Sequence, residues 1–320
     1  MMLYKKQNIL ILFLILFSFI DCDAYSQTLD YNFSEITVDY TLYNNSITAI
    51  EQDSFGFLWI GTLRGLFRYD GINSKRVTLL DEKYSLKKIN AIYKDKKNNL
   101  WIALDNVVFL FDKSNLNFSS FDFKNIFGNK IKKVINIFKI AEDDLGNILF
   151  FSKYHIFKYN IISKNFEIFY FEKSFISINS ILIKDNRIIV SLLNEIISLD
   201  KNDIRQNEID ILLNRINSKE YKKLSIDFIT SLLSYSTEYF LIDKTKGLKS
   251  FYFKNNEVKL KSKLNNQLDR IKDKIRFLYI DRKNKFWVIT KDEKLYLFLP
   301  TLDELIDFNE KYSITSLNFS

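Results

Sequence analysis

The chain has 320 residues, of which 47% are hydrophobic and 16% are aromatic, so it can bury a large core and is not disordered over its bulk. Its formal net charge is +8, but Lys and Arg are dispersed among Asp and Glu, which argues against a nucleic-acid partner. One proline, seven glycines and many Ile, Phe, Tyr and Val residues favour short strands. The composition therefore predicts an all-β protein.

Residues 1–26 have the pattern of a secretory signal peptide. Lys5 and Lys6 precede an unbroken apolar run from Ile9 to Ile20, and this run is shorter than the roughly 18 residues that a membrane-spanning helix needs. Cleavage after Ser26 or after Ala24 fits the small residues there. We therefore expect export to the periplasm with a mature domain at 27–320, or a membrane anchor if the segment is not cleaved.

A repeat of about 45 residues organises the remaining chain. The segment from Asp53 to Thr62 returns at shifts of 42, 90 and 228 residues, and weaker copies run from Ile178 to Asp200 and from Ile229 to Phe253. The motif residues are Asp53, Gly56, Trp59, Gly61, Gly65, Tyr69, Asp70 and Gly71 in the first copy, then Asp95, Trp101, Asp143, Gly146, Asp281 and Trp287 in later copies. Six copies are counted in this way.

Each copy opens with a short strand. The openers are Ile47–Ile50, Ile89–Ile92, Val134–Ile137, Ile178–Ile181, Ile229–Leu232 and Ile275–Leu278, and a seventh, Ile314–Leu317, comes near the end of the sequence. Four short strands per copy fit one blade of a β-propeller, whereas a helical repeat needs apolar residues at helical spacing. We therefore predict six complete four-stranded blades and the start of a seventh, in an incomplete or open ring.

The motif is interpreted as hairpin chemistry. Asp53 is suited to bind the backbone of its own turn, and Gly56 tolerates a positive φ angle just before the next strand. Leu58 and Ile60 are expected on one face of that strand and Trp59 on the other, so that the strand presses against both neighbouring blades. The recurring aromatic residues are thus first explained as packing between blades.

The motifs of the first copy, Asn44–Ile50, Asp53–Thr62 and Gly65–Gly71, resemble the two-component regulator propeller repeat. The resemblance is specific in the first copy and partial in the second, third and sixth. It implies a seven-bladed propeller which, in larger family members, stands in the periplasm before a transmembrane helix and a histidine kinase and often senses polysaccharide fragments. This chain shows no kinase segment, so the resemblance implies a fragment of such a receptor, with the kinase portion as its partner.

The sequence offers few groups for catalysis. Cys22 lies within the expected signal peptide, and the single histidine, His155, occupies the turn position of Gly65. We therefore predict no catalytic residues, no metal site and no cofactor. Acidic residues such as Asp53 and Asp95 recur at one position and are interpreted as turn formers.

A binding site is expected where the second turn of each copy gathers on one face of the ring. The candidate ligand-binding residues are Arg64, Asn106, Tyr154, Asn194, Lys246 and Asp292. Aromatic and polar groups there suit an oligosaccharide or another small ligand. A ligand-sensing module is the leading hypothesis, and the alternatives are an envelope protein-interaction scaffold and a glycan-active enzyme with carboxylates from different blades.

Overall fold

Twenty-three short strands make up most of the described chain. The computed structural model describes residues 46–80, 82–131, 133–170, 178–184, 187–191, 196–200, 229–236, 238–254, 257–261, 264 and 266–312. Residues 38–320 form one compact unit. The expected signal peptide at 1–26 and the seventh opener at 314–317 lie outside the described residues.

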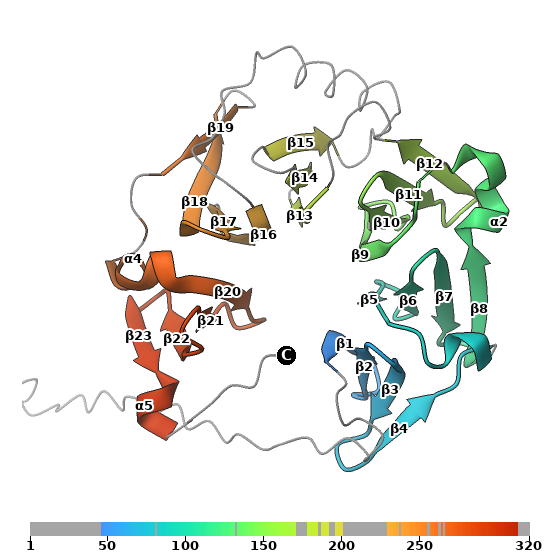
Figure 1. Cartoon of the computed structure of the whole chain (residues 1–320), viewed down its shortest axis with the longest axis horizontal. Helices are drawn as coiled ribbons and strands as arrows, with labels where there is room; N and C mark the ends of the chain where they lie inside the picture. The colour runs from blue at the N-terminus through green and yellow to red at the C-terminus, as the bar shows by residue number, and fades with distance from the viewer. Residues whose placement is uncertain are drawn as a thin grey trace, which may run out of the picture. The chain divides into compact units, whose positions relative to one another are not determined.

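The strands form six antiparallel sheets, each built from consecutive strands of the chain (Figure 1). The first three sheets comprise β1 (Ile47–Gln52), β2 (Leu58–Thr62), β3 (Gly65–Tyr69) and β4 (Ser74–Val77); β5 (Ala91–Lys94), β6 (Leu100–Leu104), β7 (Val107–Asp112) and β8 (Asn117–Asp122); and β9 (Ile137–Glu142), β10 (Ile148–Ser152), β11 (His155–Tyr159) and β12 (Phe166–Tyr170). The last three comprise β13 (Ser180–Lys184), β14 (Arg187–Ser191) and β15 (Ile196–Asp200); β16 (Ile229–Tyr235), β17 (Glu238–Asp243), β18 (Gly247–Lys254) and β19 (Glu257–Leu260); and β20 (Ile275–Ile280), β21 (Phe286–Thr290), β22 (Leu295–Leu299) and β23 (Glu304–Asp307).

Short helices lie in the connections that follow a sheet's outer strand. They are η2 (Glu82–Tyr84), α2 (Phe123–Phe127), η3 (Gly128–Lys130), α4 (Asn266–Ile271), η4 (Lys272–Lys274) and α5 (Phe308–Tyr312). Asp122 caps α2, because its carboxylate accepts hydrogen bonds from the backbone nitrogens of Lys124 and Asn125.

This is an all-β propeller of four-stranded blades, as the sequence predicts, but the predicted blade count is wrong. Five described sheets have four strands, and the sheet of β13, β14 and β15 has three. The prediction counted repeat openers, and an opener specifies only the innermost strand of a blade. Five complete four-stranded blades are therefore described, and residues 201–228, which follow β15, lie outside the described residues.

The predicted opener Val134–Ile137 is also wrong by three residues. The inner strand β9 begins at Ile137, which pairs with Ser152 just as Ile47 pairs with Thr62 in the first sheet. Ile137 lies six residues before Asp143, the same spacing as from Ile47 to Asp53. That spacing to the turn aspartate identifies the inner strand better than the apolar alternation does.

The second strand of each sheet packs on both of its neighbours. In β6, Trp101 and Ala103 join the hydrophobic cluster shared with the third sheet, while Leu100 and Ile102 join the cluster shared with the first. Alternate side chains of β10, β14 and β17, the other described second strands that lie between two sheets, are divided between two clusters in the same way. Five clusters thus fill the five junctions between consecutive sheets, which confirms that alternate residues of this strand face opposite blades.

The first turn of the motif is built around one aspartate side chain. Asp53 Oδ1 accepts hydrogen bonds from the backbone nitrogens of Phe55 and Phe57 at 2.8 and 3.0 Å. Gly56 has a φ angle of +95°, and Asn98 in the second sheet has +66°. Both parts of the predicted hairpin chemistry are therefore confirmed.

The same aspartate also binds the motif tryptophan, a contact that sequence reasoning did not anticipate. Trp59 Nε1 donates to Asp53 Oδ2 at 2.8 Å, and equivalent bonds of 3.0 Å join Trp101 to Asp95 and Trp287 to Asp281. Because a buried indole N–H needs an acceptor, this bond allows the ring to enter the junction between sheets. In the third sheet, where leucine replaces tryptophan, Asn147 Nδ2 donates to Asp143 Oδ2 instead, at 2.8 Å.

We predict that Asp95→Ala destabilises the protein by about 2 kcal/mol or more. The buried Trp101 indole loses a charged hydrogen-bond acceptor, and the backbone nitrogen of Asn99 in the turn loses its acceptor as well. Urea unfolding followed by tryptophan fluorescence measures the change. Asp112→Ala is the matched control, since its carboxylate accepts from Ser114 in an exposed turn. Equal losses in the two variants would contradict a special role for the carboxylate–indole bond.

The Asp281 turn predicts a pH dependence. Desolvation is the largest influence and raises the pKa of this carboxyl, but the hydrogen bonds from Lys285, Trp287 and Lys283 together hold the pKa below its usual 3.8. A lowered folded-state pKa contributes stability above pH 3.8 that is lost as the pH falls through the lower value. The stability difference between wild type and Asp281→Asn should therefore shrink between pH 6 and pH 3 in urea titrations, and a constant difference would refute the assignment.

Candidate ligand-binding face

The second turn of each sheet lies at the end where the chain enters the next sheet. Strand one runs away from this end and strand two returns to it, so the turns between strands two and three share it with the connections between sheets. We call this end the second-turn face, defined by the turns at 62–65, 104–107, 152–155, 243–247 and 290–294 and the connections beside them. The strand directions put the candidate turns of the described sheets at this end.

Hydrogen bonds tie these turns to the connections. Ile89 N donates to Thr62 O at 2.9 Å, Ile137 N to Asp105 O at 3.0 Å, and Ile178 N to Lys153 O at 3.1 Å. Each bond joins the second turn of one sheet to the segment that starts the following sheet. The face is therefore held by the backbone, and its exposed side chains are free to vary.

A small polar side chain closes several of these turns from inside. Thr62 Oγ1 accepts from Arg64 N at 3.1 Å and donates to Gly65 O at 2.9 Å. Ser152 Oγ similarly accepts from His155 N at 3.1 Å, and both Ser152 and His155 are fully buried. His155 is thus the first residue of β11, at the end of the second turn, and the fold encloses it; the sequence predicts a turn or strand residue there.

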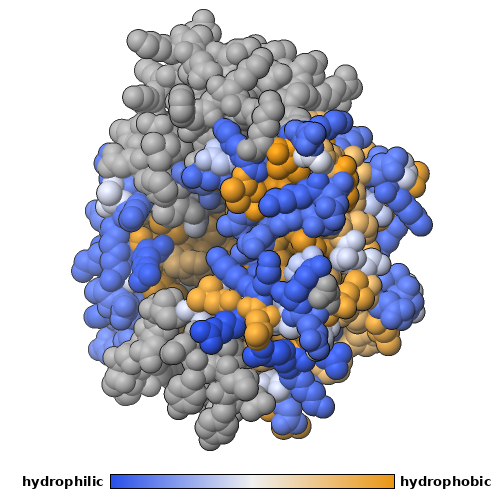
Figure 2. Space-filling view, turned by 45° about the vertical axis from the view of Figure 1, so that its right-hand side comes forward, coloured by the Kyte–Doolittle hydropathy of each residue, from blue (hydrophilic) through white to orange (hydrophobic). Residues whose placement is uncertain are grey.

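The structure places five of the six candidate residues on the second-turn face. Arg64, Lys246 and Asp292 are exposed there, and Asn106 and Tyr154 are half-buried. Asn194 lies outside the described residues. The surface seen in Figure 2 carries hydrophilic side chains that separate smaller hydrophobic areas.

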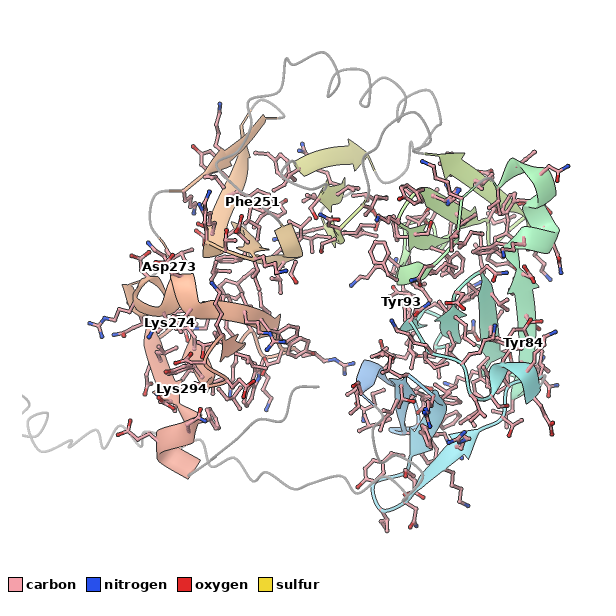
Figure 3. All side chains as sticks on the ribbon, viewed as in Figure 1. Tyr84, Tyr93, Phe251, Asp273, Lys274 and Lys294 are labelled. Atoms are coloured by element: carbon pink, nitrogen blue, oxygen red, sulfur yellow. The ribbon has the colours of Figure 1, made fainter. Side chains whose placement is uncertain are left out.

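Two of the candidates have structural partners. Asn106 Nδ2 donates to Asp122 Oδ1 at 2.8 Å and so supports the cap of α2. A hydrogen bond with Thr290 is the largest influence on Asp292 and, with Lys274 and Lys294 nearby, holds the pKa of its carboxyl below the usual value. Figure 3 shows Lys274 and Lys294 beside the sixth sheet.

Sequence reasoning included the loop of Lys153 and Tyr154, but it missed the contacts between lysines and aromatic rings on this face. Lys133 and Lys153 lie over the Tyr154 ring, with 4.3 and 5.5 Å from each Nζ to the ring centroid. Lys83 and Lys87 lie near the Tyr84 ring at 4.8 and 5.9 Å. Lys133 comes from the connection between two sheets, so only the fold brings it to Tyr154. In the other cluster, Lys83 and Lys87 lie one and three residues from Tyr84, and this short spacing was the one signal available in the sequence.

At the opposite end of the sheets, three carboxylates lie near Tyr93. Burial, followed by the charges of Glu142, Asp95 and Glu51, raises the pKa of the Tyr93 phenol to about 12. Glu142 itself accepts a hydrogen bond from Lys96 N at 2.8 Å. Tyr93 therefore stays protonated near neutral pH and serves as a hydrogen-bonding and packing group.

We predict that Gly65→Ala is strongly destabilising. Gly65 has a φ angle of +117°, and an added Cβ would lie 2.4 Å from the backbone oxygen of Ser85 in the connection to the second sheet. Gly71→Ala is the control, because Gly71 has a φ of +102° with open space around it. Both variants carry backbone strain of about 1–3 kcal/mol, but only Gly65→Ala adds the clash with Ser85. Urea unfolding should therefore show a clearly larger loss of unfolding free energy for Gly65→Ala. Similar losses in the two variants would mean that the turn and the connection are not packed together.

Within the described ranges, no three or more His, Cys, Asp and Glu side chains are arranged to hold a metal ion. Over the same ranges, none of the helices has the length and hydropathy needed to cross a membrane. The second-turn face presents cations, aromatic rings and amides on turns and connections that backbone hydrogen bonds join.

The fold and this face define a propeller of repeated four-stranded blades. Residues 44–64 match the family model described as two-component regulator propeller, which confirms the resemblance seen in the first repeat. No curated protein matches the chain.

Solved structures share the fold. The extracellular domain of a protein described as a hybrid two-component system from B. thetaiotaomicron aligns with a TM-score of 0.58 at 16% identity, over 82% of this chain and 35% of that one. An inactive virginiamycin B lyase from Staphylococcus aureus aligns with a TM-score of 0.56 at 10% identity, over 86% and 87%. PorZ, a surface component of the type-IX secretion system of Porphyromonas gingivalis, aligns with a TM-score of 0.51 at 13% identity, over 78% of this chain and 38% of that one. The chain thus spans about a third of the first of these structures, and neighbours with this fold include both a sensor-system domain and an enzyme.

Proposed function

We propose that this protein is an exported, non-catalytic propeller that binds a ligand as the sensing module of a two-component receptor. The observation that carries the proposal is the second-turn face, where cations and aromatic rings stand on turns fixed by backbone hydrogen bonds. A rigid frame with variable exposed side chains is the usual design of a binding surface. The match of residues 44–64 to the two-component regulator propeller supports the receptor context.

The ligand that we propose is an oligosaccharide. Sugar rings present apolar C–H faces and many hydroxyl groups, so they bind to aromatic rings bordered by amides and charged groups. The second-turn face offers the half-buried Tyr84 and Tyr154 and the exposed Arg64 and Lys246. Neither a metal nor a cofactor is needed for binding of this kind.

The binding site is tested by calorimetric titration of the full-length exported protein with a panel of neutral and acidic oligosaccharides. We expect at least one to bind, and Arg64→Ala with Lys246→Ala to weaken its binding by about three-fold or more, the order expected for two exposed polar contacts. Lys97→Ala with Lys283→Ala is the matched control, because both lysines are exposed on first turns at the opposite end. Binding that responds only to the control pair would place the site elsewhere.

The receptor role is tested on the native gene product. Immunoprecipitation of this protein from detergent-solubilised cells should recover histidine kinase activity, seen as phosphate transfer from labelled ATP to a histidine. Recovery of the protein without kinase activity would contradict the receptor role and would favour an envelope scaffold.

A further inference from the structure

The junction between the second and third sheets concentrates positive charge around one aromatic ring. Tyr154 is half-buried in the second turn of the third sheet. The ammonium group of Lys133 lies 4.3 Å from its ring centroid and that of Lys153 lies 5.5 Å from it. Lys133 belongs to the connection that precedes β9, so the two cations reach the ring from different segments.

Neither cation is neutralised within the described part of the chain. Within the described ranges, the Lys133 and Lys153 ammonium groups form no ion pair with a carboxylate, and the contacts that they make are those with the Tyr154 ring. Asp105 is exposed on the neighbouring second turn, and its backbone oxygen binds Ile137 N, but its carboxylate pairs with neither lysine. Both ammonium groups are positively charged, so each would attract an anion that binds beside the Tyr154 ring.

The same connection adds a hydrogen-bonding group and an apolar group. Asn136 is exposed, and its Oδ1 accepts a hydrogen bond of 2.7 Å from Asn90 Nδ2, which orients the amide. This leaves the Asn136 amide nitrogen as a donor toward solvent. Val134, the residue after Lys133, is 79% exposed and adds apolar surface to the same segment.

The preceding junction repeats the combination. Lys83 and Lys87 lie within 4.8 and 5.9 Å of the Tyr84 ring centroid, and Tyr84 is fixed by an edge contact with Phe109 at 5.2 Å. Figure 3 shows Tyr84 at the outer side of the sheets and Tyr93 at the inner side. Two consecutive junctions thus each place two lysines beside a tyrosine, although Tyr84 comes from a connection and Tyr154 from a second turn.

We propose that the Tyr154 site binds an acidic sugar, one that carries a carboxylate or a sulfate. The Lys133 and Lys153 ammonium groups hold the anion, the Asn136 amide donates to a ring hydroxyl, and Tyr154 with Val134 contacts the apolar face of the sugar. That the ligand is a saccharide rests on the function proposed above. That it is anionic rests on the paired cations, and the two parts are separable by experiment.

Calorimetric titration of the full-length exported protein with matched oligosaccharides tests the anionic part. The probes are trigalacturonate, its fully methyl-esterified form, a sulfated galactan oligosaccharide and its desulfated form. We expect an acidic form to bind at least about ten-fold more tightly than its neutral counterpart and to weaken as salt is raised, because exposed ion pairs are screened. The carboxylated and sulfated arms show which anion is preferred.

Lys133→Gln with Lys153→Gln should weaken binding of the acidic probe by about ten-fold and leave any binding of the neutral form unchanged. Lys113→Gln is the matched control, because Lys113 lies 5.1 Å from the ring centroid of Phe55 in a first turn at the opposite end. An unchanged thermal melting temperature in the double variant verifies folding.

Three outcomes would overturn the proposal. Equal affinity for acidic and neutral forms refutes the anionic part alone, and unchanged affinity in the double variant refutes the site. If no oligosaccharide binds, the saccharide function fails. In that case phosphatidylglycerol vesicles and a DNA oligonucleotide are tested, and their lysine-dependent binding would identify another class of anionic partner.

Discussion

The whole arrangement depends on the second strand of each sheet serving two junctions at once. Alternate residues of a strand point to opposite faces, and in β6 this sends Trp101 to the third sheet and Ile102 to the first. One strand therefore couples three consecutive sheets. A one-residue slip would exchange the two sets of side chains, which is why the turn before the strand is fixed so firmly by Asp95 and its tryptophan.

That coupling separates stability from recognition. The clusters between sheets and the carboxylate–indole bonds lie inside the blades or toward the first turns. The second-turn face contributes mainly backbone bonds and buried small groups such as Thr62 and Ser152. Exposed side chains such as Arg64 and Lys153 can consequently differ between propellers at little cost in folding free energy, which suits a fold shared by an extracellular domain of a two-component system and a lyase.

Electrostatics gives the two ends of the sheets different characters. At the first-turn end, the carboxylates of Glu142 and Asp95 surround the buried phenol of Tyr93 and raise its pKa. At the second-turn end, the lysines around Tyr154 have no described carboxylate partner. The fold therefore gathers some of the positive charges of a chain with a net charge of +8 beside Tyr154, although composition alone shows only dispersed charges.

The sequence by itself determined the strand class, the repeat, the turn role of Asp53 and Gly56, and the face on which the second turns gather, because these follow from local turn chemistry and from period-two alternation. It did not determine the strand count of the fourth sheet, the start of β9 at Ile137, the bond from Trp59 to Asp53, or the approach of Lys133 to Tyr154. Those features depend on which hydrogen-bonding partners and neighbouring segments are near in space. Only tertiary packing decides that, since it joins connections and turns that are far apart in the chain.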